Sequence, residues 1–246
     1  MLRFGPQRAG SSCAGRLRHQ GSGRLGRRSE TRQGSGEDEL SGAIFRWAAP
    51  LFARSAKRWS EDDAEAFARM LDPFLSLQGR LLDLGGGTGA LAGLLARARP
   101  CVVTVLDSSP RMLRYAERLP GVEPVVGVAS AIPFDDGRFD AVLVCDAFHH
   151  FDKREKAARE MARVVRSGGG VVIAEADSAA CSTRFMALAE RILGEPAGFL
   201  RPVDLERLMD AVGVHGSSER QGGASYVYIG EVASGIGQQA CENRGR

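Results

Sequence analysis

Residues 81–91 read LLDLGGGTGAL: a short apolar run, four glycines within five positions, and the start of a second apolar run. This order predicts a buried strand, a tight turn and then a helix. Glycine allows the positive φ angles of such a turn and the close approach of a ligand to the backbone. The unpaired N–H groups at the start of the helix favour an anionic ligand group. The segment predicts a nucleotide-type ligand at the carboxyl end of the strand, with a merely tight turn as the alternative.

Short apolar runs alternate with helical patterns on both sides of this loop. The runs lie at residues 80–84, 101–106, 122–126, 141–145 and 171–174, and the helical patterns at 89–98, 110–119 and 153–165. Alternating strands and helices imply right-handed βαβ units and a parallel sheet. Strands that are almost entirely apolar indicate a sheet covered on both faces. We therefore predict a doubly wound α/β fold.

Elements at both ends extend this core. Ser60 begins an SEDD segment that predicts a helix start with a capping box to Asp63. Near the other end, residues 205–212 have a helical pattern, and 214–218 and 225–232 have strand patterns. These last segments predict a helix followed by two strands.

Several nucleotide-binding classes do not fit the loop. A phosphate-binding P-loop requires a Gly-Lys pair, and the chain contains none. The dinucleotide fingerprint is Gly-x-Gly-x-x-Gly, whereas Gly85, Gly87 and Gly89 are spaced Gly-x-Gly-x-Gly. Short-chain dehydrogenases also need Tyr-x-x-x-Lys, and no tyrosine here has lysine four residues later. A nicotinamide oxidoreductase is therefore disfavoured.

Five segments in register resemble the motifs of one family. They are DLGGGTG at residues 83–89, VTVLDSS at 103–109, IPFDDGRFD at 132–140, FHHF at 148–151 and RVVRSGG at 163–169. Together they resemble class I S-adenosylmethionine-dependent methyltransferases, in particular the methyltransferase type 11 or ubiquinone/menaquinone-biosynthesis-like group. The resemblance is close over residues 80–177 and looser over 178–232. It implies a Rossmann-like, seven-stranded, mostly parallel sheet with an antiparallel C-terminal strand.

The resemblance also implies S-adenosylmethionine as the cofactor and a set of residues that bind it. In this sequence the matching positions are Asp83, Gly85, Gly86, Gly87, Gly89, Asp107, Ser108, Met112, Ala129 and Ser130. Asp107 would accept hydrogen bonds from the ribose hydroxyls, with a helix cap as the alternative. Asp83 would order the glycine loop and face the methionine ammonium, directly or through water. Ser108 and Met112 would line the adenine side.

One position departs from the family pattern. The family usually has an acid after the third strand that reads the adenine amino group, and this chain has Val128 there. The Ala129 N–H would still serve the adenine ring, and Ser130 would substitute in part. Loss of the acid is expected to cost about 1–2 kcal/mol of cofactor binding.

Candidate catalytic residues follow the fourth strand. Asp146 would orient the acceptor, or else cap the following turn. His149 and His150 have three interpretations: packing at the mouth of the site, acid–base chemistry and a metal pair. Adjacent histidines seldom complete a metal site, so we expect none.

Methyl transfer requires alignment of a nucleophile with the sulfonium methyl in a dry pocket, so no catalytic triad is needed. The chain lacks an Asn/Asp-Pro-Pro-Tyr segment after the fourth strand, which disfavours methylation of nucleobase or glutamine amino groups. We expect a small-molecule acceptor, quinone-like or lipid-like. The alternative from another class is a non-catalytic binding or scaffold protein that keeps the fold, and Val128 is its best argument.

Composition bounds the remaining possibilities. The chain is 43% hydrophobic and 26% charged, as in ordinary globular proteins, and it has no apolar stretch long enough to span a membrane. Residues 1–36 hold eight arginines and one acid, whereas the rest has 25 basic and 29 acidic residues. The domain itself therefore predicts no nucleic-acid partner. Five scattered cysteines without a Cys-x-x-Cys pair indicate a cytoplasmic protein with no structural zinc.

We expect three parts in the chain. Residues 1–40 would be a disordered tail rich in Arg and Gly, 41–233 the methyltransferase domain, and 234–246 a flexible C-terminal tail. The first tail has three interpretations: an inert or misassigned start, an organellar transit peptide and a weak polyanion-binding arm. The sequence leaves the oligomeric state open.

Overall fold

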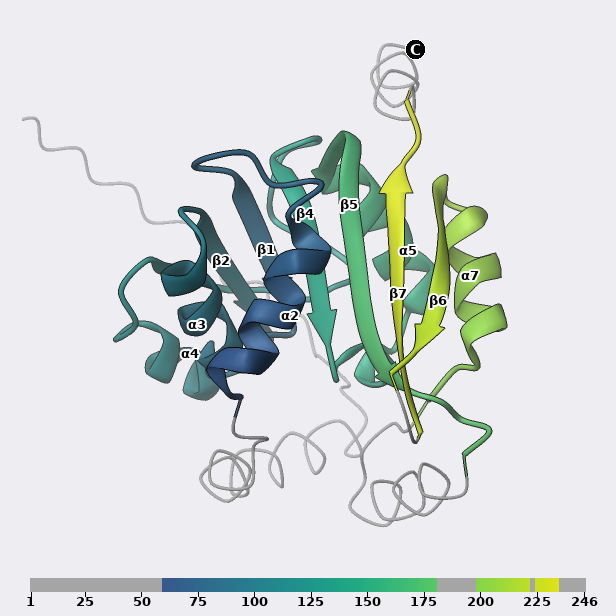
Figure 1. Ribbon diagram of the computed structural model, residues 1–246, viewed down its shortest axis with the longest axis horizontal. Helices are drawn as coiled ribbons and strands as arrows, with labels where there is room; N and C mark the ends of the chain where they lie inside the picture. The colour runs from purple at the N-terminus through teal and green to yellow at the C-terminus, as the bar shows by residue number, and fades with distance from the viewer. Residues whose placement is uncertain (1–58, 181–197, 222–223, 235–246) are drawn as a thin grey trace, which may run out of the picture. The chain divides into compact units, whose positions relative to one another are not determined.

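The computed structural model describes residues 59–180, 198–221 and 224–234 (Figure 1). The expected tail at residues 1–40 lies outside these residues, as does the expected C-terminal tail from residue 235 onward. No helix within the described ranges combines the length and the apolar character needed to cross a bilayer.

Strands and helices alternate along the described chain. In order they are α2 (Glu61–Leu71), β1 (Arg80–Leu84), α3 (Ala90–Ala98), β2 (Val102–Asp107), α4 (Pro110–Ala116), β3 (Val122–Val126), β4 (Phe139–Cys145), the short 3-10 helix η1 (Phe148–His150), α5 (Arg154–Val164), β5 (Val165–Ala176), α7 (Pro202–Asp210), β6 (Val214–Arg220) and β7 (Ser225–Val232). This order confirms the predicted α/β alternation and the two predicted strands after the last helix.

The strands form a seven-stranded sheet in the order β3-β2-β1-β4-β5-β7-β6. Neighbouring strands from β3 to β5 are parallel, and β7 runs antiparallel to both β5 and β6. The arrows of β5 and β7 accordingly point in opposite directions in Figure 1. The sheet confirms the prediction of a mostly parallel, Rossmann-like fold with an antiparallel strand near the C-terminus.

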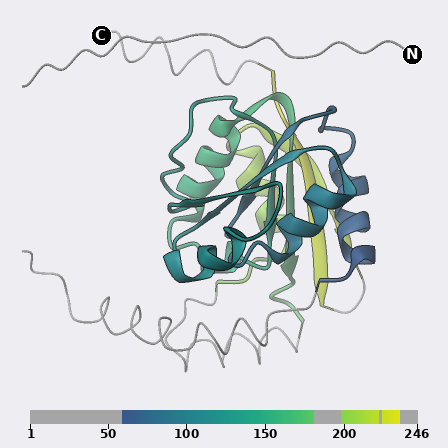
Figure 2. The same cartoon turned by 90° about the vertical axis from the view of Figure 1, so that its left-hand side faces the viewer.

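Helices cover both faces of the sheet, as Figure 2 shows. Leu81 of β1 packs in one core cluster with residues of α2, α3 and α4. Leu82 and Leu84 of the same strand face the other cluster, which contains residues of α5 and α7. Because successive strand residues point to opposite faces, a strand that is buried on both sides is mostly apolar, and Asp83 is the buried exception in β1.

The start of α2 follows the prediction in detail. The Ser60 side chain accepts a hydrogen bond from the Asp63 backbone N–H, and the Asp63 carboxylate accepts one from the Ser60 N–H. This reciprocal pair satisfies two N–H groups that the first turn leaves unpaired.

The largest difference from the predicted elements is in β5. The sequence predicts a strand at residues 171–174 preceded by a turn, but β5 already begins at Val165. Its pairing with β4 is irregular between Phe139 and Ala141, and Gly168 there has φ +70. The glycine segment is therefore a bulge within a longer strand, because glycine lets a strand continue through a positive φ angle.

Candidate functional site

The glycine loop connects the carboxyl end of β1 to α3. Gly85, Gly87 and Gly89 have φ angles of +77, +56 and +70. All three glycines of the Gly-x-Gly-x-Gly pattern therefore adopt a left-handed backbone conformation. A Cβ atom on Gly85 would lie 2.7 Å from the Cβ of Ala147, which follows β4. The loop thus requires glycine both for its backbone conformation and for its close contact with the neighbouring strand end.

Asp107, the last residue of β2, holds this loop. One carboxylate oxygen accepts the Gly87 N–H at 2.9 Å, and the other accepts the Ser109 N–H at 2.8 Å. The second bond fixes the turn before α4 but does not cap the helix, because the N-cap residue is Ser109 and no side chain makes a capping bond there, so the capping alternative is wrong. A carboxylate has about four acceptor sites, which leaves capacity for further donors such as hydroxyl groups.

Asp83 lies beneath the loop with its side chain against Gly86, where an added Cβ atom would overlap the carboxyl group. Asp83 is 2% exposed. Burial, and secondly the charge of Asp107, raise its pKa to about 7. Burial also raises the pKa of Asp107, against the lowering effect of its bonds from Ser109 and Gly87. Two carboxyl groups thus converge on one loop, an arrangement that favours a cationic ligand group over an anionic one.

The other predicted cofactor residues lie around the same strand ends. The Met112 methyl group is 3.3 Å from where a Cβ on Gly87 would lie, so this side chain rests on the loop. Ser108 is exposed next to Asp107. The turn that carries Ala129 and Ser130 begins where the Gly127 N–H donates to the Asp107 backbone oxygen at 3.0 Å.

The departure at Val128 is visible on this turn. Val128 pairs with Ala131 in an isolated antiparallel bridge and is 49% exposed. The acid expected from the family pattern is thus replaced by a solvent-facing apolar side chain.

The predicted catalytic candidates gather after β4 around a residue that sequence reasoning missed. The buried His149 ring contacts both carboxylate oxygens of Glu175 through Nδ1, at 2.9 and 3.1 Å. Asp146 lies in the same cluster: one ligand atom from each of Asp146, His149 and Glu175 falls within 4.8 Å of the others. The His150 ring lies beside His149, with 4.0 Å between ring centroids, and is not a member of the cluster. The signal for Glu175 was its position directly after the apolar run 171–174 at a strand's carboxyl end.

This cluster adjoins the glycine loop. β1 and β4 are parallel neighbours, and the residue after Asp146 is Ala147, which packs against Gly85. In the sheet, β2 and β3 lie on one side of β1, whereas β4 and β5 lie on the other side. The direction in which successive strands are added therefore reverses between β1 and β4. In open α/β sheets such a reversal is where ligands bind, outside the carboxyl ends of the strands.

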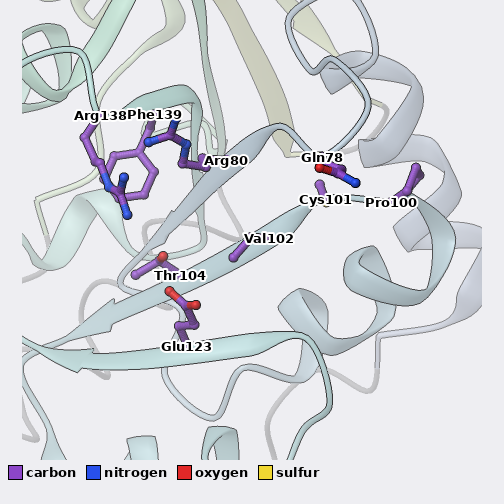
Figure 3. A pocket seen from close by; sticks show the side chains of 9 residues that line it. All are labelled: Gln78, Arg80, Pro100, Cys101, Val102, Thr104, Glu123, Arg138 and Phe139. Atoms are coloured by element: carbon purple, nitrogen blue, oxygen red, sulfur yellow. The ribbon is translucent and has the colours of Figure 1, made fainter. Parts of the chain in front are cut away.

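A separate cavity lies at the opposite edge of the sheet. It measures about 580 Å³ and is lined in part by Arg80, Val102 and Phe139, which begin β1, β2 and β4 (Figure 3). None of the predicted site residues lines it. The clustered acids and the glycine loop place the candidate site at the carboxyl ends, away from this cavity.

Comparison with known proteins agrees with the geometry. Residues 82–173 match the family described as a methyltransferase domain. The chain is 45% identical over 98 residues to the demethylmenaquinone methyltransferase of Thermotoga maritima, covering 39% of this chain and 43% of that protein. It is 35% identical over 128 residues to the sarcosine/dimethylglycine N-methyltransferase of Halorhodospira halochloris, covering 47% and 46%. The chain therefore spans less than half the length of these relatives.

A solved methyltransferase structure also has a similar fold. A crystal structure of an S-adenosylmethionine-dependent methyltransferase from Thermotoga maritima superposes with a TM-score of 0.63 at 21% identity, covering 78% of this chain and 99% of that one. At this identity the match establishes the fold, which is that of the class I methyltransferases.

Proposed function

We propose that this chain, whose residues 82–173 are a methyltransferase domain, transfers a methyl group from S-adenosylmethionine to a small molecule. The observation that carries the proposal is the glycine loop closed by Asp107 and underlain by Asp83. The proposed domain comprises residues 41–233, of which 41–58, 181–197 and 222–223 lie outside the described residues.

The charge of the site fits this cofactor. S-adenosylmethionine carries an ammonium and a sulfonium group near its carboxylate, whereas a dinucleotide would bring a pyrophosphate to the loop. Asp83 lies under Gly86 and the charge of Asp107 raises its pKa further. A pyrophosphate would add like charge to these two acids, and a cation would relieve their repulsion.

Each predicted cofactor residue receives a role in this proposal. Asp107 accepts the ribose hydroxyl hydrogen bonds, while its bond from Gly87 keeps the loop in place. Asp83 faces the ammonium group. The exposed Ser108 and the half-buried Met112 border the adenine, and the Ala129 N–H and the Ser130 hydroxyl serve the ring from the turn after β3.

The cofactor supplies an electrophilic methyl group on a good leaving group. The chain must then hold the acceptor in line with that methyl group and exclude water. The Asp146–His149–Glu175 cluster adjoins the loop through Ala147, so it borders the place where an acceptor would lie. Phe199 stacks on His149 with 4.1 Å between ring centroids and supplies an apolar wall there.

The acceptor class is the broadest part of the proposal. Relatives named for demethylmenaquinone and for sarcosine/dimethylglycine share this region with the chain, so the domain accommodates dissimilar acceptors. We favour a quinone-like or lipid-like small molecule. We also propose a cytoplasmic location, since Cys101 is a free thiol and the sequence holds no Cys-x-x-Cys pair.

A second candidate is a non-catalytic protein that uses the fold for binding or as a scaffold. Val128 favours it, because an exposed valine occupies the position of the adenine-reading acid. The glycine loop held by Asp107 supports a cofactor site, which favours the enzyme.

Calorimetric titration of the full chain tests the proposal. We expect S-adenosylmethionine and S-adenosylhomocysteine to bind in the micromolar range and NADH not to bind. Asp107→Ala should abolish binding, and Asp135→Ala, at an exposed acid away from the loop, should bind like the unsubstituted chain. No binding of the first two ligands would overturn the enzyme proposal and favour the scaffold.

A further inference from the structure

We propose that Asp146, His149 and Glu175 form a binding site for one divalent transition-metal ion. The three residues come from different local structures: Asp146 directly follows β4, His149 lies in η1, and Glu175 is near the end of β5. One nitrogen or oxygen atom from each lies within 4.8 Å of the other two.

The separation between His149 and Glu175 suits a shared ion. Metal–ligand bonds of about 2.0–2.2 Å place neighbouring ligands of an octahedral ion about 3 Å apart and opposite ones a little over 4 Å apart. His149 Nδ1 and Glu175 Oε2 are 2.9 Å apart. The contact is a hydrogen bond while Nδ1 carries a proton, and an ion that replaced the proton would find both atoms at the spacing of adjacent ligands.

The buried half of the site is held rigidly. The side chains of His149 and Glu175 are each 3% exposed. The His149 backbone N–H donates to Glu175 Oε1 at 3.3 Å, and the ring stacks on Phe199. Ligands fixed by packing and by hydrogen bonds lose little conformational freedom when an ion binds.

The exposed half carries a strained backbone. Asp146 has φ +53, a conformation that is uncommon for residues other than glycine. Its backbone N–H donates to the Ala174 oxygen at 2.9 Å, which holds the residue beside Glu175. Strain of this kind persists where the surrounding structure enforces it, and here it brings a second carboxylate to the histidine.

Charge also favours a cation. Within the described residues, neither Asp146 nor Glu175 forms an ion pair with an arginine or lysine. The buried Glu175 carboxylate has the His149 ring beside it, and a divalent ion would offset the cost of burying its charge.

The donor set indicates the class of metal. One imidazole nitrogen and two carboxylate oxygens, with no thiolate, suit ions such as Mn²⁺, Fe²⁺ or Zn²⁺. Three protein ligands leave coordination positions open on the solvent side of Asp146. A hydroxyl of the acceptor bound there would lose its proton to solvent more readily, and this last step alone rests on the proposed methyl transfer.

The test is metal binding by the full chain after treatment with a chelator. We expect one Mn²⁺ per chain by electron paramagnetic resonance and by calorimetry. Asp146→Asn, His149→Gln and Glu175→Gln should each weaken binding by about tenfold or more. Asp146 is exposed, so its variant tests the site without disturbing the core.

Two matched variants serve as controls. His150→Gln changes the adjacent histidine outside the cluster, and Asp135→Asn changes an exposed acid elsewhere, so both should bind Mn²⁺ like the unsubstituted chain. Absence of Mn²⁺ and Zn²⁺ binding at about 1 mM, or binding that survives all three cluster substitutions, would overturn the proposal. Titration of S-adenosylmethionine into the same metal-free protein reports separately on the cofactor site.

Discussion

The carboxylate of Asp107 accepts the Gly87 backbone N–H at 2.9 Å, which joins the end of β2 to the glycine loop twenty residues earlier in the chain. The same side chain also accepts the Ser109 N–H and so fixes the turn into α4. One carboxylate therefore organises both walls of the candidate cofactor site before any ligand binds. This preorganisation lowers the entropy that a ligand would otherwise lose in ordering the loop.

Asp83 should make stability depend on pH. Its pKa is raised from 3.8 to about 7 in the folded protein, so its contribution to the free energy of unfolding is full below pH 3.8 and is lost as the pH rises to 7. Asparagine does not ionise, so Asp83→Asn lacks this pH dependence. The free energy of unfolding of the variant, measured relative to that of the unsubstituted chain, should therefore increase as the pH rises from 4 to 8. Urea unfolding at several pH values measures this difference, and parallel pH profiles for the two proteins would contradict it.

The same group should make cofactor binding depend on pH in the opposite direction. A protonated Asp83 does not attract an ammonium group, so the affinity for S-adenosylmethionine should increase as the pH rises through about 7. Asp83→Asn should bind more weakly and with little pH dependence in this range. Calorimetry between pH 6 and 8 tests this expectation, and an unchanged slope in the variant would refute it.

Gly86→Ala should damage the cofactor site through a single methyl group. The added Cβ would overlap the Asp83 carboxyl group, which lies against the backbone. The loop must then shift, and we expect the affinity for S-adenosylhomocysteine to fall by about tenfold or more. Gly93→Ala in α3 is the matched control, because its Cβ meets only the flexible Leu119 side chain at 3.2 Å. Equal binding by both variants would show that the loop tolerates displacement.

Arg163 should stabilise residues 132–136, which follow the turn that carries Ala129 and Ser130. Its guanidinium donates to the backbone oxygens of Phe134 and Ile132, at 2.7 and 2.9 Å, and pairs with Glu160 and Asp136. Arg163→Lys keeps the charge but cannot reproduce these forked bonds. We expect a loss of about 1–3 kcal/mol in the free energy of unfolding, measured by chemical denaturation. A loss no larger than that of Arg159→Lys, an exposed change on the same helix, would argue against this role.

Val128→Asp should strengthen cofactor binding. Val128 is 49% exposed, so an aspartate there would not be buried, and it would supply the acid that the resemblance to the family leads us to expect near the adenine amino group. A gain of about 1–2 kcal/mol, or roughly tenfold in Kd, is expected from one added hydrogen bond. Calorimetry with S-adenosylhomocysteine measures the gain, with Val128→Asn as the uncharged comparison. Unchanged or weaker binding by Val128→Asp would indicate that the adenine lies elsewhere.

Local patterns in the sequence were sufficient for the order of elements and for the glycine loop. Apolar runs indicate strands that are buried on both faces, and the glycines at 85, 87 and 89 indicate positive φ angles. Both features depend on residues that are close together in the chain, so the sequence is enough to predict them. The capping box between Ser60 and Asp63 was predictable for the same reason. The early start of β5 was not, since strand pairing decided it rather than hydrophobicity.

Only the tertiary structure brought together groups that are distant in sequence. The pKa of Asp83 follows from its burial and from the charge of Asp107, neither of which the sequence around Asp83 reveals. Glu175 lies beside Asp146 because β4 and β5 pair in a register that places Cys145 beside Ala174, so the residues that follow these two lie at the same edge of the sheet. A sequence specifies its strands locally, but which side chains share the edge of the sheet depends on that register.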